Sequence, residues 1–310
     1  MTSGVITRAA GRRDAPKKKP ARRGPAVPVR LGKGLLLLIC CAVVLIPFLV
    51  VVSTSLADNA QITAAGGYVV WPTHPTFDAY RAILSGGVVT HALFVSIGVT
   101  VVGTLLSLLC TTLLAYSLAT PGSFGSRPLL LIVLFTLLFT PGIIPSYLIV
   151  KELGLLDSYW SVILPVLVNG FNVIVMRSFF AELPKDVLDS ARIDGAGEFR
   201  ILVRIVVPLS KAVIAVIGLF YAVSYWNSFF TAMLYLNDAS KWPLQLILRT
   251  YVIDAAPLGA DNLGVPTDAV PPQQSLQMAV LVISLVPILL VYPFLQRHFA
   301  KGALIGAVKG

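Results

Sequence analysis

Very few residues of this 310-residue chain have the types and spacings that carry out covalent or metal chemistry. The three histidines and three cysteines form neither an H-E-x-x-H nor a C-x-x-C pattern, so no metal or thiol site is predicted. The G-x-x-x-x-G-K-[ST] loop that binds nucleotide phosphates is missing as well. The sequence therefore predicts neither catalysis nor a cofactor held by this chain itself.

The clearest spacing of charged and apolar residues lies in the segment 182–209. A first short helix is predicted after Pro184, which suits the first turn because its missing N–H costs nothing there. Acidic residues follow at the end that the helix dipole favours, and Gly195 can take the left-handed backbone that ends a helix. The acids are Asp186 and Asp189, and the predicted apolar face consists of Val187, Leu188 and Ala191.

A second short helix is predicted between Gly195 and Pro208. Its apolar residues recur at helical spacing, and Arg200 and Arg204 lie on another stripe. Basic amphipathic helices of this kind often rest on lipid headgroups. The alternative is a docking element for a cytoplasmic partner. The predicted apolar stripe consists of Phe199, Leu202, Val203 and Val206.

A membrane domain must position these helices, because only 12% of the residues are charged and 56% are hydrophobic. Soluble domains carry about 25% charged residues, so an ordinary soluble enzyme is excluded. A bilayer core needs about 20 apolar residues in a helix. The predicted fold is an all-α membrane protein with a basic tail, 1–33, and one domain, 34–310, of six uncharged spans. These are 34–52, 92–118, 128–150, 160–176, 213–236 and 276–296.

Charge is divided unevenly between the segments that connect these spans. If the N-terminus is cytoplasmic, the inner segments hold 20 basic and 6 acidic residues, and the outer segments hold 4 basic and 8 acidic residues. The positive-inside rule therefore predicts a multi-pass protein with both termini in the cytoplasm. Ten of the inner basic residues lie in the tail 1–33. We expect this tail to be disordered and attracted to anionic lipid rather than to nucleic acid.

The predicted spans contain no Asp, Glu, Lys or Arg. Ion-coupled carriers usually place ionisable groups inside their spans, where these relay protons or pair with ions. If this protein moves a solute, we therefore expect the energy to enter from outside the membrane.

The segment 182–209 resembles the E-A-A-x3-G-x9-I-x-L-P signature of permease subunits of binding-protein-dependent ABC importers. This sequence has Asp for Glu, Ser for the first Ala and Val for Leu. The residues around this signature are similar to the carbohydrate-uptake branch of the family. The resemblance covers residues 29–310, including the C-terminal stretch 299–310. Within that branch the chain resembles the smaller permease of the maltose-type transporter. The matching residues are Asp189-Ser190-Ala191, Gly195 and Ile205-Val206-Val207-Pro208.

This resemblance implies a type I importer permease in a bacterial cell membrane. It implies that the hairpin couples to a cytoplasmic ATPase dimer, which binds the ATP, and that a second permease subunit completes a heterodimer. An extracellular solute-binding protein would deliver the solute, which we expect to be an oligosaccharide. The residues that the resemblance assigns to ATPase coupling are Asp189, Ala191, Arg192, Asp194, Gly195, Ala196 and Pro208.

Polar and aromatic residues inside two spans are candidates for the solute path. Amides and aromatic faces suit sugar hydroxyls and C–H faces, and polar residues in spans usually face the bundle interior. Hydrogen bonds between helices explain the same residues without a solute, and we favour this alternative. The candidates are Asn169 and Asn172 in the fourth span, and Tyr225, Trp226 and Asn227 in the fifth.

Other functions remain open from the sequence. A permease for amino acids or phosphate would share the same signature. A secondary carrier is disfavoured by the uncharged spans. A membrane scaffold or receptor that binds a partner through the cytoplasmic hairpin is a third possibility. The outer segment 237–275 is either a solvated loop or an element that reaches into the binding protein.

Overall fold

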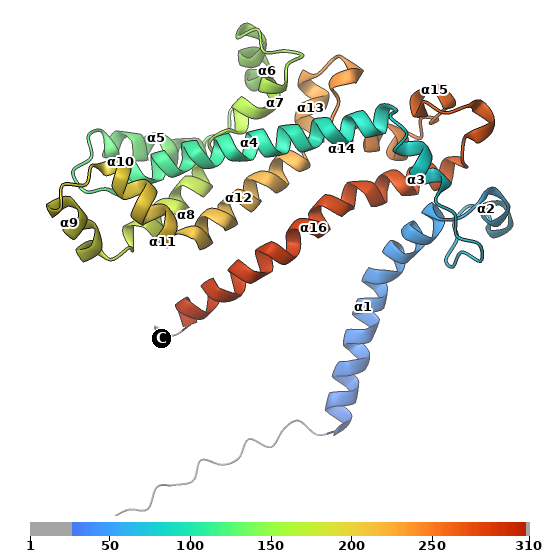
Figure 1. The fold of residues 1–310 in the computed structure, drawn as a ribbon, viewed down its shortest axis with the longest axis horizontal. Helices are drawn as coiled ribbons and strands as arrows, with labels where there is room; N and C mark the ends of the chain where they lie inside the picture. The colour runs from blue at the N-terminus through green and yellow to red at the C-terminus, as the bar shows by residue number, and fades with distance from the viewer. Residues whose placement is uncertain (1–26, 308–310) are drawn as a thin grey trace, which may run out of the picture. The chain divides into compact units, whose positions relative to one another are not determined.

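A computed structural model describes residues 27–307, and every regular element within this range is a helix (Figure 1). Most of the predicted basic tail, residues 1–26, lies outside the described part, as do residues 308–310 of the C-terminal stretch. The chain divides into two compact units, Met1–Pro47 and Phe48–Gly310.

Helix α1 (Val27–Ser55) provides the described part of the first unit and the first residues of the second. Its segment Leu31–Ser55 is apolar and long enough to cross a bilayer, and it contains the first predicted span. Pro47 lies at the boundary between the two units. Because proline lacks an N–H group, it removes one hydrogen bond from the helix at this point.

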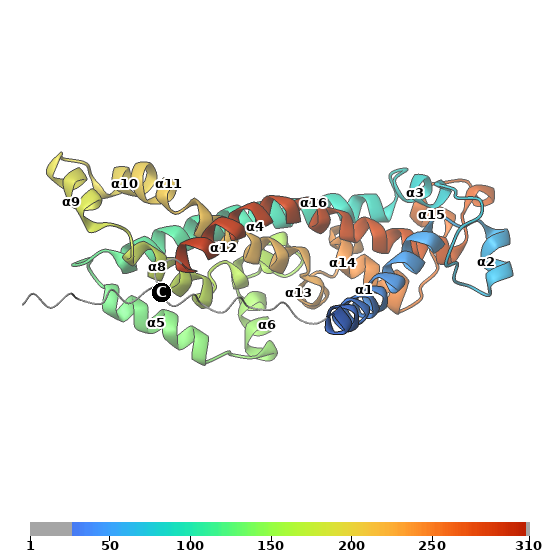
Figure 2. The ribbon, with the colours of Figure 1, turned by 90° about the horizontal axis from the view of Figure 1, so that it is seen from below.

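The second unit is organised around the long helix α4 (Val88–Ala119). This helix packs along α8 (Gly170–Ala181) and α12 (Lys211–Trp226), and α12 also packs along α16 (Gln273–Ala307) (Figures 1 and 2). A close contact between α4 and α12 depends on Gly103, because a Cβ atom there would lie 2.8 Å from the ring of Tyr225. The buried cluster between these helices includes Val99, Ala115, Met176, Phe180, Ile201, Val206, Ile217, Tyr221 and Tyr225.

A second buried cluster lies at the end of α4 that begins with Val88. Short helices surround this end and pack against α4 and α16. They are α3 (Asp78–Ile83), α14 (Leu244–Leu248) and α15 (Ala260–Leu263). The cluster includes Ile83, Val89, Leu244, Ile247, Leu263, Leu276 and Val280.

Four further short elements flank these helices in the sequence. They are α2 (Asn59–Ala65), η3 (Ala239–Lys241), η4 (Arg249–Ile253) and η5 (Thr267–Ala269). The end of α1 is joined to this region by side-chain hydrogen bonds, including one of 2.6 Å between the hydroxyls of Ser55 and Tyr80.

The third predicted span, 128–150, is not one helix. It consists of α5 (Ser126–Leu138) and α6 (Ile143–Glu152), separated by residues 139–142. The Pro141-Gly142 dipeptide lies in this break. Proline disfavours helical backbone at the residue before it, so the apolar run was a poor guide to helix continuity here.

The fourth and fifth predicted spans are also interrupted. The fourth consists of α7 (Tyr159–Ile163), η1 (Leu164–Val166) and α8, with a bend of 50°. In the fifth, α12 ends at Trp226 and α13 (Phe229–Tyr235) follows after a two-residue break. Within the described residues three helices are long and apolar enough to cross a membrane. The number rises to five if each of two bent pairs, 159–166 with 170–181 and 198–209 with 211–226, is one span. The six predicted spans are therefore not six continuous helices.

Candidate functional site

The segment predicted as two short helices forms a hairpin at one end of the α4, α8 and α12 layer (Figures 1 and 2). Its first helix is α9 (Lys185–Ile193), and its second runs without a break through α10 (Glu198–Ile201), η2 (Leu202–Val206) and α11 (Val207–Leu209). These elements and the turn between them are called the hairpin below. Gly195 has φ +77°, the left-handed backbone that the sequence predicts for the turn.

The apolar residues of α9 lie only in part on the predicted face. Leu188 and Ala191 pack against the cluster between α4, α8 and α12. Val187, which was predicted on the same face, is exposed, and so is Ile193, at 86%. Helix α9 therefore carries exposed apolar side chains at two positions, about 120° apart around its axis.

The second helix of the hairpin departs from prediction in the same way. Leu202 and Val206 are buried, whereas Phe199 is 73% exposed and Val203 is also exposed. Successive residues of a helix are about 100° apart, so Leu202 and Val203 point in different directions. The single predicted apolar stripe is wrong, because these residues form one buried and one exposed stripe.

Four side chains connect the hairpin to the end of α4, and we call them the hairpin network: Tyr116, Asp189, Arg192 and Glu198. The Arg192 guanidinium donates to Asp189 Oδ1 at 3.0 Å and to Glu198 Oε1 at 3.0 Å. The hydroxyl of Tyr116 donates to Glu198 Oε2. Arg192 and Tyr116 together lower the pKa of the Glu198 carboxyl, since both stabilise its ionised form.

Two members of this network were not predicted from the sequence. Glu198 follows Arg192 by six residues across a turn, so neither helix alone places them together. Tyr116 lies 82 residues before Glu198, and no local pattern joins the two. A cavity of about 320 Å³ lies beside the network, lined in part by Tyr116, Phe180, Leu188, Asp189 and Arg192.

The other predicted coupling residues have separate positions in the hairpin. Asp194 is exposed and caps the end of α9, where its N–H donates to Ser190 O at 3.0 Å. Ala196 packs against the buried cluster. Pro208 lies within α11, and the helix ends one residue later, at Leu209, where the chain bends by 85° into α12. The predicted end of the second helix is therefore correct to within one residue.

The candidate path residues of the fourth span lie at the start of α8. The side chain of Asn169 caps this helix, accepting from the N–H of Asn172 at 3.2 Å, and its own N–H donates to the hydroxyl of Tyr221 at 3.0 Å. Asn169 is exposed, whereas Asn172 is buried. Arg177 follows on the same helix and donates from Nε to Leu118 O at 3.0 Å.

The candidate path residues of the fifth span have mostly internal partners. The hydroxyl of Tyr225 lies 2.8 Å from that of Ser107 and 3.2 Å from Ile163 O. Trp226 is buried, and its indole N–H donates to Ser284 O at 3.2 Å. Asn227 is exposed but donates to Val223 O of its own helix at 2.8 Å. This geometry agrees with hydrogen bonding between helices for Tyr225 and Trp226.

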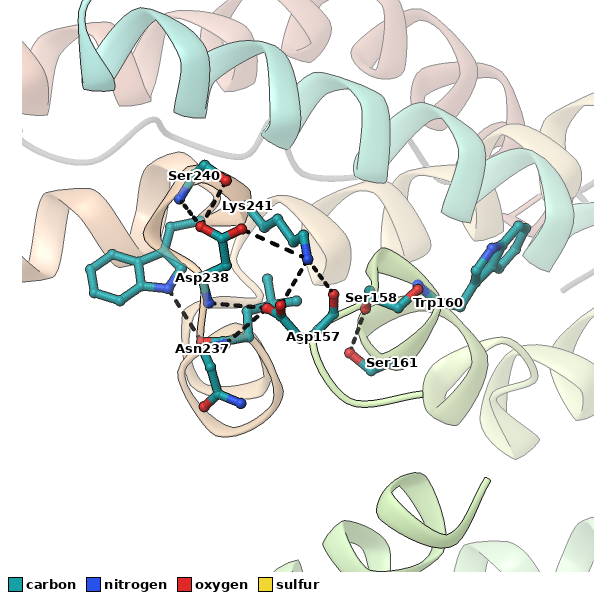
Figure 3. Close-up of polar contacts among 10 residues, drawn as sticks. Asp157, Ser158, Trp160, Ser161, Asn237, Asp238, Ser240 and Lys241 are labelled. Carbon is teal, nitrogen blue, oxygen red and sulfur yellow. Dashed lines mark hydrogen bonds and ion pairs between the residues drawn. The ribbon is translucent and has the colours of Figure 1, made fainter. Parts of the chain in front are cut away.

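A polar cluster away from the hairpin joins two loops (Figure 3). Lys241 Nζ lies 2.8 Å from Asp157 Oδ2 and 2.8 Å from Asp157 O. The other oxygen, Asp157 Oδ1, accepts from the backbone N–H groups of Asn237 and Asp238. Hydrogen bonding to Lys241 is the main cause that lowers the pKa of Asp157. The cluster fixes the loop before α7 to the loop after α13.

Within the described residues, no group of three or more His, Cys, Asp or Glu side chains is arranged to hold a metal ion. A cavity of about 520 Å³ lies between the start of α2, α3 and the segment before α16, and it is lined in part by Asp58, Asp78, Arg81 and Asp268.

Comparison with known proteins gives consistent results. A family model described as a binding-protein-dependent transport system inner membrane component matches residues 108–304. The polygalacturonan/rhamnogalacturonan transport system permease protein YtcP of Bacillus subtilis (strain 168) is 45% identical over 274 residues, which are 88% of this chain and 96% of that protein. Protein LplC of the same strain is 48% identical over 269 residues, which are 87% and 90% of the two chains.

The fold has a close counterpart among solved structures. A chain in the crystal structure of a bacterial ABC transporter, involved in the import of the acidic polysaccharide alginate, superimposes with a TM-score of 0.81 and 31% identity. The superposition covers 89% of this chain and 99% of that chain. The helical fold is thus that of an ABC importer permease, a multi-pass membrane protein, as the hairpin signature predicts. The chain belongs to the family of binding-protein-dependent transport system inner membrane components.

Proposed function

We propose that this chain is a permease subunit of an ATP-driven importer for carbohydrate, and that its substrate is an oligosaccharide. The observation that carries this proposal is similarity along almost the whole chain to a polygalacturonan/rhamnogalacturonan transport permease, 45% identical over 88% of the residues. The structural counterpart belongs to a transporter that imports another acidic polysaccharide. The chain would form one half of the translocation path and would leave ATP hydrolysis to a separate subunit.

We propose six membrane crossings, although not all are continuous helices. Three crossings are the apolar helices α1, α4 and α16, and a fourth is the bent pair of α7 and α8. Helix α12 has 16 residues and rises about 24 Å, which is shorter than a bilayer core. Either α13 or the segment at the hairpin end of α12 therefore completes this fifth crossing. The apolar helix α5 has 13 residues and rises only about 20 Å, so the sixth crossing also needs the segment that follows it toward α6.

Charge supports an orientation with the hairpin in the cytoplasm. The segment that contains it is rich in basic residues, and the outer segments are net acidic. Phe124, between α4 and α5, and Trp71, after α2, are both exposed and would lie on opposite sides of the membrane. In a chain without native cysteines, an impermeant thiol reagent should label Trp71→Cys from outside and Phe124→Cys only after lysis. The reverse pattern would refute this orientation.

The hairpin is the proposed docking element for the ATPase. It presents exposed apolar side chains from both helices, Ile193 and Phe199 among them, together with the exposed acid Asp189. Desolvating such a patch against a protein groove is favourable. The coupling role of Asp189, Ala191, Arg192, Asp194, Gly195, Ala196 and Pro208 remains a prediction from the signature.

The remaining partners follow from the same proposal. A second permease would complete the path, and an extracellular binding protein would dock on the outer elements α2, α3, α14 and α15. The path residues Asn169 and Asn227 are exposed in this chain and remain predictions. Asn172, Tyr225 and Trp226 are buried, so any contact with solute would require a rearrangement of the helices.

The test uses the complete transporter in proteoliposomes. This chain would be co-expressed with the second permease and the ATPase, and the binding protein would be loaded with oligogalacturonides, neutral oligosaccharides or glycerol phosphate. The proposal expects ATP hydrolysis and uptake to rise only when the binding protein carries an oligosaccharide. Stimulation by glycerol phosphate alone would favour the alternative of another solute class. Uptake without the ATPase, driven by an ion gradient, would favour a secondary carrier.

A further inference from the structure

The hairpin network joins the two neighbouring helices of the hairpin to α4, which lies about 80 residues earlier in the sequence. Arg192 belongs to α9, Glu198 begins α10, and Tyr116 lies near the end of α4. One carboxylate oxygen of Glu198 accepts from Arg192 at 3.0 Å, and the other accepts from the Tyr116 hydroxyl. Glu198 therefore contacts both the first helix of the hairpin and a membrane-spanning helix.

The turn of the hairpin is closed without this network. The backbone N–H of Gly195 donates to Arg192 O at 3.0 Å, and that of Ala196 donates to Ala191 O at 3.0 Å. Together with the left-handed backbone of Gly195, these bonds satisfy the end of α9. The contacts of Glu198 are therefore additional to the turn, and what they add is a connection to α4.

Apolar packing holds α9 only weakly. None of its residues is fully buried, and the cavity of about 320 Å³ lies between it and the ends of α4 and α8. Tyr116 and Arg192 both line this cavity. Because a close-packed interface resists displacement more strongly, we expect α9 to shift more easily than the rest of the hairpin. Beside the apolar contacts of Leu188 and Ala191, the polar contacts through Glu198 are a direct link between α9 and α4.

Helix α4 is well placed to pass such a shift onward. Just before Tyr116, the hydroxyl of Thr111 lies 2.7 Å from that of Tyr221 on α12. Just after it, the carbonyl of Leu118 accepts from Arg177 on α8. Since Tyr221 also accepts from the N–H of Asn169, a displacement of α4 acts on both neighbouring spans and on the start of α8.

We propose that Tyr116 and Glu198 are positioning residues for transport, which with Arg192 transmit the movement of α9 to α4. The inference rests on the proposed function, because the ATPase is what would move α9. The arrangement also explains how Arg192 can stay connected to α4 when the ATPase docks. If a basic group of the ATPase binds Asp189, Arg192 loses one carboxylate partner but keeps Glu198, so the link to α4 stays closed.

The test uses Tyr116→Phe, which removes one hydrogen bond, and Glu198→Gln, which removes the charge that both contacts of Glu198 share, each with little change of shape. Matched controls are Tyr147→Phe, at a half-buried tyrosine of α6, and Glu182→Gln, at an exposed carboxylate just before the hairpin. Each variant is purified in the complete transporter and reconstituted. We expect the ATPase to co-purify as in the wild type. Stimulation of hydrolysis by loaded binding protein should fall at least about tenfold, within the usual range of coupling between sites.

The double variant distinguishes one link from two independent effects. If Tyr116 and Glu198 act through their mutual contact, the double variant should lose little more than either single variant. Losses that add, or single variants within twofold of the controls, would overturn the inference. Failure of both variants to retain the ATPase would also overturn it, because the network would then support docking itself. A wild-type chain that binds no ATPase would instead refute the proposed function.

Discussion

Gly195→Val tests whether the backbone of the hairpin turn is essential for coupling. Gly195 has φ +77°, and no atom lies within 4 Å of the position that a Cβ would occupy. The substitution therefore introduces no clash with another part of the chain. Its cost is backbone strain, about 1–2 kcal/mol for an ordinary L residue and more for a β-branched one.

This strain energy is comparable to the net free energy of the hydrogen bonds that close the turn. The turn depends on the two backbone bonds from Gly195 and Ala196, each with a net value of about 1 kcal/mol. Strain of about 1–2 kcal/mol shifts an equilibrium by roughly 5- to 30-fold, so much of the population would leave the native turn. We expect stimulated ATP hydrolysis to fall by a factor in that range. Asparagine tolerates left-handed backbone, so Gly195→Asn should retain more coupling than valine.

The chain offers a control two residues away. Gly197 has φ −69°, which any residue can adopt, and a Cβ added there would also have no atom within 4 Å. Gly197→Val therefore adds the same side chain to the same turn without the strain. Membrane insertion and ATPase co-purification are measured beside stimulated hydrolysis. Equal hydrolysis by the two valine variants, or full activity of Gly195→Val, would refute this reasoning.

Three further predictions concern packing, the outer loops and docking. Gly103→Leu should lower the melting temperature of the detergent-purified chain through overpacking of about 1–3 kcal/mol, whereas Gly98→Leu, where a Cβ meets nothing within 4 Å, should not. Asp157→Asn should make the loops around Lys241 more sensitive to protease. Because the pKa of Asp157 is lowered, wild-type protection should hold at neutral pH, begin to weaken below the ordinary aspartate pKa of about 4, and be lost as the pH falls through the lowered value. Equal digestion of both proteins at neutral pH would contradict this. Asp189→Lys should reduce ATPase co-purification in moderate salt, and unchanged recovery would count against docking at this acid.

The sequence was most informative where a short local pattern determines the structure. Gly195 could be placed in the turn because left-handed backbone strongly favours glycine, and the structure has it there. The family could likewise be predicted from the spacing around this glycine. The exposed positions of Val187 and Phe199 could not, because which apolar stripe is buried depends on where the hairpin meets α4 and α8.

The spans show why an apolar run is not the same as a helix. Hydropathy reports that a segment can avoid water, whereas helix continuity depends on individual residues such as Pro141 and Asn169. Proline disrupts the backbone before it, and Asn169 begins a new helix by capping α8 with its side chain. Partners such as Tyr116 and Glu198 are the least predictable, since only the packing of α4 against the hairpin brings them together.

The internal hydrogen bonds of the spans also constrain where a solute could pass. Tyr221 and Tyr225 bond to α4, and Trp226 bonds to α16, so this face of α12 is committed to helix packing. The opposite face, with Ser224 and Asn227 exposed three residues apart, is not covered by the described residues of this chain. Polar groups at the depth of a bilayer are costly against lipid, which favours an aqueous path or another protein surface there. The arrangement thus fits a path that is completed by a second permease subunit.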